Sequence, residues 1–236
     1  RLGDQPNLLA VRLDVTREDE AHQAVAAGIK RFGRIDVLIN NAGFGVLGAV
    51  EETSASETER LFATNVFGLL NVTRAVLPPM RAQRSGRVIN ISSIGGYQAY
   101  MGWGVYGSTK FAVEGITEAL HQELAPLGIQ ATVVEPGFFR TDFLDEQSLI
   151  KTRLELADYD ETVGKMRAFA EAANHAQPGD PQKFAEAMLA LVNAPNPPQR
   201  LALGSDTVAR IEAKNRLVAQ ELAEWNELAL STDFAN

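Results

Sequence analysis

The chain has 236 residues, of which 45% are apolar and 22% charged, and its formal net charge is −8. This composition fits one ordinary globular domain with a sizeable core, and the negative charge argues against nucleic acid and anionic membranes as partners. The chain contains no cysteine, which excludes disulfides and a thiolate metal site.

We expect neither a membrane span nor a metal site. No apolar run approaches the roughly 20 residues that cross a bilayer, and no secretory signal is visible, so we predict a cytoplasmic protein. The three histidines, His22, His121 and His175, are scattered along the sequence. They are expected at the surface or paired inside helices rather than as metal ligands.

Strands and helices are predicted to alternate along the chain. Apolar runs predict strands at residues 8–15, 35–40, 86–93, 129–135 and 200–204. Helices are predicted from 16 to 33, from 56 to about 78, from 104 to 125, from 180 onward and from 205 onward. Apolar strands that alternate with helices indicate an α/β fold, a doubly wound parallel sheet with both faces covered.

Helix-capping signals mark three of these helix starts. Thr16 with Asp19 resembles a capping box, and Ser56 with Glu59 is a better one. Asp180 stands before a proline and is typical of an N-cap. Residues 142–177 are charged and only weakly helical, which predicts a mobile flap on the substrate side of a single domain spanning residues 1–236.

The stretch from Gly86 to Ala125 contains a candidate acid/base site. The strand here ends on two hydroxyls, Ser92 and Ser93, and the following helix carries Tyr106 and Lys110, four residues apart on one helix face. A phenol has a pKa of about 10 in water, and a neighbouring ammonium lowers it toward the pH at which acid/base catalysis works. An exposed tyrosine beside a solvated lysine is the alternative, which the serines upstream make less favourable.

Two further features have more than one interpretation. Residues 43–48, GFGVLG, match the dinucleotide-binding pattern G-x-G-x-x-G, but no helix opens at the third glycine, so we assign these glycines to tight turns or close backbone approach. Asp14 ends a predicted strand and is either a ribose ligand or an aspartate at a helix start. Asn65 lies inside a helical pattern, where it either caps a local kink or belongs to the site.

Five motifs in order resemble the short-chain dehydrogenases/reductases. They are NNAG at 40–43, NVFG at 65–68, NISS at 90–93, YGSTK at 106–110 and PGFFRT at 136–141. The resemblance covers essentially the whole chain. The carboxyl-terminal part, with LGSD at 203–206, is similar to the branch named for 17β-hydroxysteroid dehydrogenases.

The resemblance implies a Rossmann-like domain that transfers a hydride between NAD(P)H, with NADPH favoured, and an alcohol or carbonyl compound. In this family the catalytic serine stands thirteen residues before the tyrosine, which selects Ser93. The implied catalytic residues are Asn65, Ser93, Tyr106 and Lys110. Tyr106 would be the general acid/base, and Lys110 would lower the pKa of Tyr106 and bind the nicotinamide ribose. Asn65 would support a water relay. The implied cofactor contacts are Asp14, Val15, Asn41, Ala42, Gly43, Tyr106, Lys110, Pro136, Gly137, Phe139 and Thr141. In the family's strand order Asp14 is then not the ribose-selecting acid.

The sequence departs from the family at its start, because the first βαβ unit with its TGxxxGxG turn is not present. We therefore expect the natural protein to extend upstream, and the 236 residues alone to bind cofactor weakly or not at all and so to lack activity. If the chain folds without these strands, the edge of the strand at 35–40 should be exposed or paired with residues 8–15 or another chain.

The substrate is expected to be a hydrophobic ketone or secondary alcohol. Aromatic and aliphatic residues lie near the proposed site, namely Tyr97, Trp103, Phe138, Phe139, Phe143 and Leu144. By resemblance, the helices at 56–78 and 104–125 predict a homo-oligomer, a dimer or tetramer. A non-catalytic scaffold or interaction protein that retains the fold is the alternative function.

Overall fold

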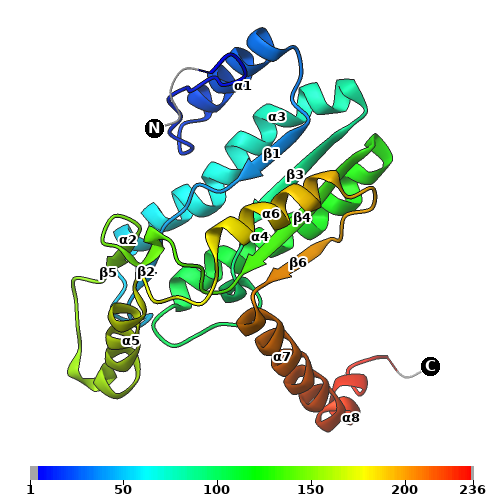
Figure 1. The fold of residues 1–236 in the computed structure, drawn as a ribbon. Coiled ribbons are helices and arrows are strands. Elements are labelled where there is room, and N and C mark those ends of the chain that lie inside the picture. The colour runs from blue at the N-terminus through cyan, green and yellow to red at the C-terminus, as the bar shows by residue number, and fades with distance from the viewer. Residues whose placement is uncertain (1–4, 235–236) are drawn as a thin grey trace.

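The computed structural model describes residues 5–234. Its main sheet has four parallel strands in the order β1-β3-β4-β6 (Figure 1). The strands are β1 (Val37–Asn40), β3 (Gly86–Ile91), β4 (Ile129–Pro136) and β6 (Arg200–Leu203). The predicted α/β parallel sheet is therefore confirmed, and the carboxyl ends of all four strands lie at one edge.

Helices cover both faces of this sheet. On one face α1 (Glu18–Phe32), α3 (Leu69–Gln83) and α4 (Gly104–Leu124) enclose the largest apolar cluster, and on the other α6 (Pro181–Asn193) packs against β3 and β4. The remaining helices are α2 (Ala55–Phe62), α5 (Lys165–Ala173), α7 (Ser205–Glu224) and α8 (Asn226–Leu230). In Figure 1, α7 and α8 project away from the sheet.

Residues 8–15 form no strand, so that prediction is wrong. Most of their apolar side chains are exposed, for example Leu8 by 37% and Val11 by 45%. In the part of the chain that the structure describes, residues 8–15 have no neighbouring strand to supply hydrogen bonds, and a strand does not form without them. Within residues 5–234 no strand pairs with the outer edge of β1 either. The expectation of an exposed β1 edge is confirmed, since Ile39 on β1 is 46% exposed.

Neither predicted capping box forms at the predicted residues. α1 begins at Glu18 after Arg17, which makes no side-chain cap, while Thr16 donates to Asp14 instead. The capping box of α2 is formed by Ser54 and Glu57, two residues before the predicted pair. The predicted cap at Asp180 is confirmed, because its carboxylate accepts the N–H of Gln182.

The helix beginning at Ala55 does not stop at the two prolines. It passes through a π-helical turn at Ala63–Gly68 and continues past Pro78 to Gln83. Beyond the prolines Met80 is fully buried against Gly86, and this packing outweighs the lost hydrogen bonds. The stretch Ala55–Gln83 is long and apolar enough to cross a membrane, but half of its most apolar window is buried inside the fold.

Residues 142–177 contain more regular secondary structure than the sequence predicted. They contain β5 (Leu149–Lys151), which pairs in parallel with β2 (Gly45–Leu47), and helix α5. Leu149, Val163 and Ala170 are buried. The mobility of this segment remains a prediction.

Candidate active site

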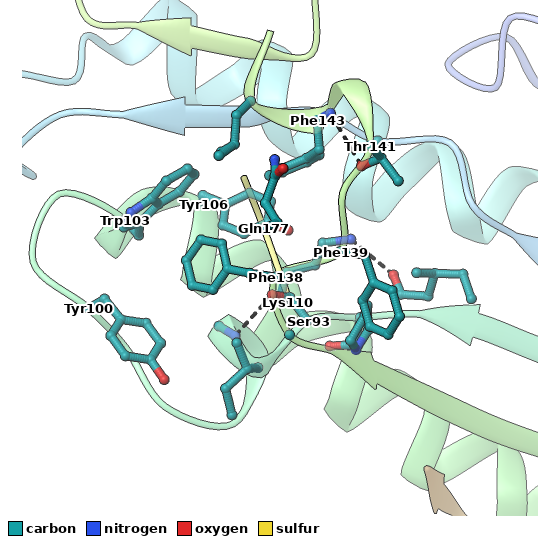
Figure 2. A pocket seen from close by; sticks show the side chains of 18 of the residues that line it. Ser93, Tyr100, Trp103, Tyr106, Lys110, Phe138, Phe139, Thr141, Phe143 and Gln177 are labelled. Carbon is teal, nitrogen blue, oxygen red and sulfur yellow. Dashed lines mark hydrogen bonds between the residues drawn. The ribbon is translucent and has the colours of Figure 1, made fainter. Parts of the chain in front are cut away.

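The candidate site lies at the carboxyl edge of the main sheet, where ligands bind in open α/β folds. A cavity of about 300 Å³ opens there between the ends of β1, β3 and β4, the first turns of α4, and the segment before α6 (Figure 2). The structure brings nine predicted site residues to its wall, namely Asn41, Gly43, Ser93, Tyr106, Lys110, Pro136, Gly137, Phe139 and Thr141.

Tyr106 stands between apolar side chains in this cavity and is 6% exposed. Its ring makes an edge contact with Trp103, 5.6 Å between centroids, and a tilted contact with Phe143 at 5.7 Å. Burial raises the pKa of the Tyr106 phenol well above its ordinary value, while a hydrogen bond with the Ser93 hydroxyl acts to lower it. The two hydroxyls predicted to act together line the same cavity.

Lys110 reaches back along the end of β3 and is 8% exposed. Its Nζ donates to the Ile91 carbonyl oxygen at 2.9 Å and lies 5.7 Å from the centre of the Tyr106 ring. Burial lowers the pKa of this ammonium to about 8, against the opposing charge of Glu114. Burial of the phenol dominates the pKa of Tyr106 here, and Lys110 Nζ bonds the Ile91 carbonyl. The lowering of the Tyr106 pKa by Lys110 remains a prediction.

Asn65 lies just outside the cavity, in the π-helical turn between α2 and α3, and is 2% exposed. Its side chain exchanges two hydrogen bonds with the backbone of Phe44, at 3.1 and 3.0 Å, and donates to the Thr109 hydroxyl at 3.2 Å. Asn65 lies at a local distortion of the helix and connects the loop after β1 to the helix that carries Lys110. Its part in the site remains a prediction.

Asp14, Val15 and Ala42 do not line the cavity. The Asp14 carboxylate accepts the N–H and hydroxyl of Thr16, at 3.0 and 2.7 Å, as an aspartate at a helix start does. Val15 packs over Gly68 on the other side of the π-helical turn. Their predicted contacts with the cofactor remain predictions.

The cavity walls are largely aromatic and aliphatic. Five of the six predicted apolar residues line it, but Tyr97 does not, since its hydroxyl donates to Asn215 of α7 at 2.5 Å. Further residues of the cavity wall were not predicted from the sequence: Tyr100 of the glycine-rich loop, and Met166, Phe169, Gln177, Pro181, Phe184 and Arg210 from distant segments. The three-residue spacing of Met166 and Phe169 on one helix face was the only sequence signal for any of them.

The rejection of residues 43–48 as a dinucleotide fingerprint agrees with the structure. Gly45 opens the short strand β2, not a helix. A Cβ on Gly48 would lie 2.3 Å from the side chain of Thr152, so this glycine permits close approach of the segment that follows β5.

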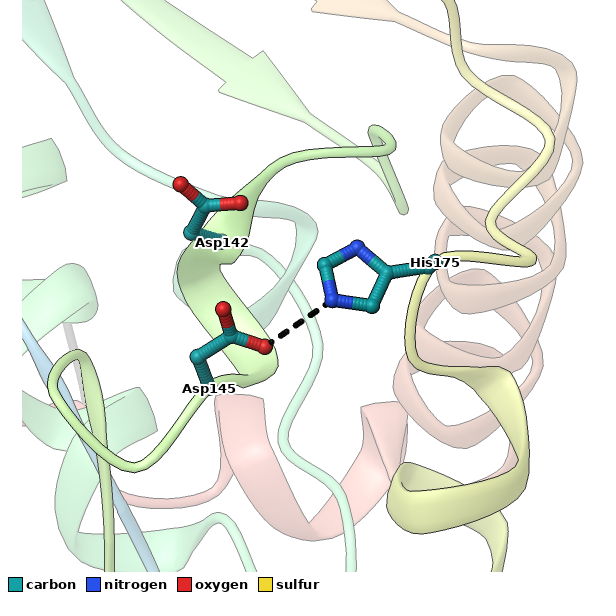
Figure 3. Close-up of side chains that lie close together, drawn as sticks. All are labelled: Asp142, Asp145 and His175. Carbon is teal, nitrogen blue, oxygen red and sulfur yellow. Dashed lines mark ion pairs between the residues drawn. The ribbon is translucent and has the colours of Figure 1, made fainter.

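Two carboxylates and a histidine lie together at the surface, the carboxylates next in sequence to Thr141, Phe143 and Leu144 of the cavity wall. Asp142, Asp145 and His175 bring their ligand atoms within 4.8 Å of one another (Figure 3). His175 Nε2 lies 3.2 Å from Asp145 Oδ1, which also accepts from Asn174 at 2.7 Å. These contacts and the exposure of the group explain its arrangement without a cation.

Comparison with known proteins shows relatives of this chain. Residues 2–150 match the model of the short chain dehydrogenases. A 3-ketodihydrosphingosine reductase from Bacteroides thetaiotaomicron is 40% identical over 193 residues, covering 81% of this chain and 71% of that protein.

Two solved structures are similar over most of the chain. A short-chain dehydrogenase from Streptomyces avermitilis superposes with a TM-score of 0.89 and 41% identity, covering 96% of this chain and 82% of that one. ElxO with NADP bound gives a TM-score of 0.68 and 27% identity, covering 84% and 77%. The chain belongs to the short-chain dehydrogenase family of oxidoreductases.

Proposed function

We propose that this chain catalyses hydride transfer between a nicotinamide cofactor and a ketone or secondary alcohol, and that reduction is its favoured direction. The observation that carries this proposal is that Ser93, Tyr106 and Lys110, from two different elements, line a single cavity. An oxidoreductase of this family needs a proton donor and an oxyanion donor on the same side of the substrate carbonyl.

Tyr106 supplies the proton in this scheme. Because burial raises its pKa, the phenol is protonated at neutral pH, and this is the form that donates to the oxygen of a ketone under reduction. Ser93 donates a hydrogen bond to the same oxygen, where negative charge develops. Lys110 then stabilises the phenolate that remains, as a neighbouring ammonium does.

The cavity fits a nicotinamide cofactor at its sheet end. A Cβ on Gly43 would lie 3.1 Å from Asn65 Oδ1 and 3.8 Å from Lys110 Nζ, so glycine keeps open the space beside this ammonium. The residues that would hold the cofactor are Asn41, Gly43, Lys110, Pro136, Gly137, Phe139 and Thr141. When bound, the cofactor supplies the hydride. NADP in the ElxO structure supports NADPH.

The substrate is proposed to be apolar around its reacting carbon. Trp103, Phe143 and Leu144 lie in the wall with Tyr106, and such surfaces favour burial of hydrocarbon. The relative named for the reduction of 3-ketodihydrosphingosine supports a ketone as the reacting group.

Consumption of NADPH and NADH by the full-length protein, with a panel of ketones, tests this function. We expect oxidation of NADPH with apolar ketones, and slower rates with NADH. No consumption with any carbonyl compound would favour a non-catalytic scaffold, and faster turnover of small charged oxo-acids would refute the apolar substrate class.

We also propose a homo-oligomer built on the helices of the site. Phe67 in the π-helical turn and Phe111 on α4 are 57% and 45% exposed, and a second copy would cover them. Light scattering that gives a monomer mass at every concentration would contradict this.

A further inference from the structure

One polar side chain in the cavity wall has no role in the chemistry described above. Gln177 lies between α5 and α6 and is 2% exposed, and Figure 2 shows it among the aromatic residues of the cavity. Neither its amide oxygen nor its amide nitrogen has a hydrogen-bond partner among residues 5–234. Buried amides are almost always paired, because an unpaired one loses its hydration without replacement.

The backbone around Gln177 is held firmly although its side chain is not. The Gln177 carbonyl accepts from Arg140 Nε at 3.1 Å, and two residues later Gly179 forms a bridge with Phe139, which follows β4. The amide is therefore carried at a fixed place beside the catalytic end of the cavity. Since no hydrogen bond holds it where it is, a change of side-chain rotamer turns it toward a ligand at no cost in hydrogen bonding.

We propose that Gln177 is a specificity-determining residue that binds a second polar group of the substrate. The proposal rests on the function given above and narrows its substrate class. An uncharged amide offers both a donor and an acceptor, so it is matched by a neutral group with both properties, such as a hydroxyl. The substrate is then an apolar ketone that carries a hydroxyl away from its reacting carbon.

The test compares 2-decanone with the series of hydroxy-2-decanones that carry the hydroxyl on C4 through C10, in the full-length protein. We expect at least one hydroxylated isomer to exceed 2-decanone in kcat/KM by about tenfold, the effect of one well-made hydrogen bond to a buried group. Gln177→Met keeps the length of the side chain and removes the amide, so this ratio should fall to about one.

Gln83→Met is the matched control. The Gln83 amide is paired with both backbone groups of Ile35, far from the cavity, so its loss should lower the melting temperature and leave the substrate ratio unchanged. Gln177→Met removes an unpaired amide and should instead raise the melting temperature of the free protein by about 2 to 4 °C.

Three results would overturn the inference, and they differ from one another. Equal kcat/KM for 2-decanone and every hydroxylated isomer refutes the polar subsite while leaving the reductase function intact. A tenfold or greater loss of NADPH affinity in Gln177→Met, measured by calorimetry, would assign the amide to the cofactor. If no ketone in the series is reduced while other ketones are, the substrate class inferred here fails and the proposed function stands; if no carbonyl compound at all is reduced, both fail.

Discussion

Asn65 and Phe44 are joined by a closed pair of hydrogen bonds: the Asn65 carbonyl oxygen accepts from the Phe44 N–H, and the Asn65 amide donates to the Phe44 carbonyl. Through this pair the π-helical turn fixes the loop that follows β1. The same amide reaches Thr109, next to Lys110 on α4. One buried side chain therefore sets the distance between two walls of the cavity.

Asn65→Ala should destabilise the protein by about 1 to 3 kcal/mol, because it leaves the Phe44 backbone groups unpaired. Urea unfolding measures this loss. Asn71→Ala is the control, since Asn71 is a helical asparagine that makes one hydrogen bond, to Val15. A loss for Asn65→Ala no larger than that for Asn71→Ala would contradict the bracing role.

Lys110→Met should raise stability at neutral pH and abolish turnover. The folded-state pKa of Lys110 is about 8, below its ordinary 10.5, so folding disfavours its charged form and stability rises with pH between these values. Removing the charge should stabilise the protein by roughly 2 to 3 kcal/mol at pH 7, and by much less at pH 10. Urea unfolding at both pH values measures the difference, and an equal effect at the two would refute the shift.

Glu114 should make stability fall as pH rises. This residue of α4 is buried with Glu135 of β4, and Arg200 of β6 binds both as well as exposed Glu118. Burial and the charge of Glu135 raise the pKa of Glu114 to about 7 from 4.5, against the charge of Arg200. The native state then holds a proton that the unfolded chain releases, so stability is lost between about pH 4.5 and 7.

In Glu114→Gln the free energy of unfolding should fall by roughly 1 to 3 kcal/mol less across that interval than in the wild type. The measurement is the free energy of unfolding at half-unit steps from pH 4.5 to 7.5. Glu118→Gln is the control, because Glu118 is 49% exposed and also binds Arg200. A profile for Glu114→Gln that parallels the wild type would show that another group takes the proton.

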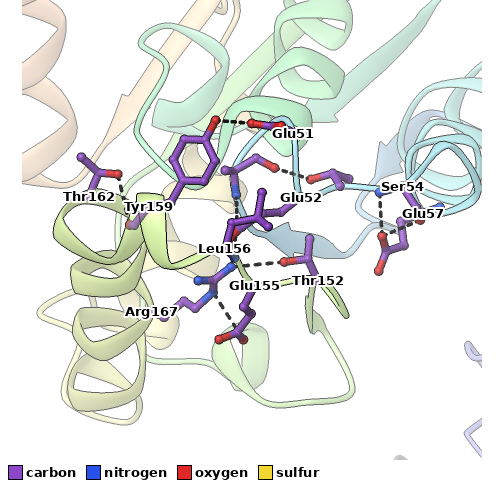
Figure 4. Close-up of polar contacts among 12 residues, drawn as sticks. Glu51, Glu52, Ser54, Glu57, Thr152, Glu155, Leu156, Tyr159, Thr162 and Arg167 are labelled. Carbon is purple, nitrogen blue, oxygen red and sulfur yellow. Dashed lines mark hydrogen bonds and ion pairs between the residues drawn. The ribbon is translucent and has the colours of Figure 1, made fainter.

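Arg167→Met should destabilise the segment that forms the outer cavity wall. Glu52 has a fully buried side chain and accepts from Arg167 at 2.5 Å and from the N–H groups of Ala49 and Leu156 (Figure 4). Loss of the cation leaves a buried carboxylate uncompensated, at a cost of about 3 to 5 kcal/mol.

Two further variants serve as controls for this prediction. Lys165→Met removes an exposed pair with Glu161 and should change stability by less than about 0.5 kcal/mol. The double variant Glu52→Gln/Arg167→Met should lose less than Arg167→Met alone. An Arg167→Met loss as small as that of Lys165→Met would mean that the pair does not anchor the segment.

The catalytic end of the site was predictable because its signals are local. Tyr106 and Lys110 are separated by one helical turn, and Ser92 and Ser93 end a strongly apolar strand, so short-range periodicity places these residues. The choice of Ser93 over Ser92 came from the family resemblance. The parallel sheet with both faces covered followed from the alternation of strands and helices. These features depend little on distant parts of the chain.

The failures were non-local. Residues 8–15 have the composition of a strand, but a strand forms only with a neighbour, and none lies beside them in residues 5–234. Gln177 and the Glu52–Arg167 pair, 115 residues apart in sequence, gain their meaning from tertiary packing alone. Tyr97 was misplaced because a glycine-rich loop gives no periodicity that fixes where a side chain points.

The central claim is that the Tyr106 hydroxyl donates the proton in ketone reduction, and Tyr106→Phe tests it most directly. This variant keeps the ring and its contacts with Trp103 and Phe143 and removes only the hydroxyl. In the full-length protein we expect the rate of NADPH-dependent ketone reduction to fall by about 10²-fold or more, while calorimetry gives an NADPH affinity close to that of the wild type. Turnover within a few-fold of the wild type would contradict the account.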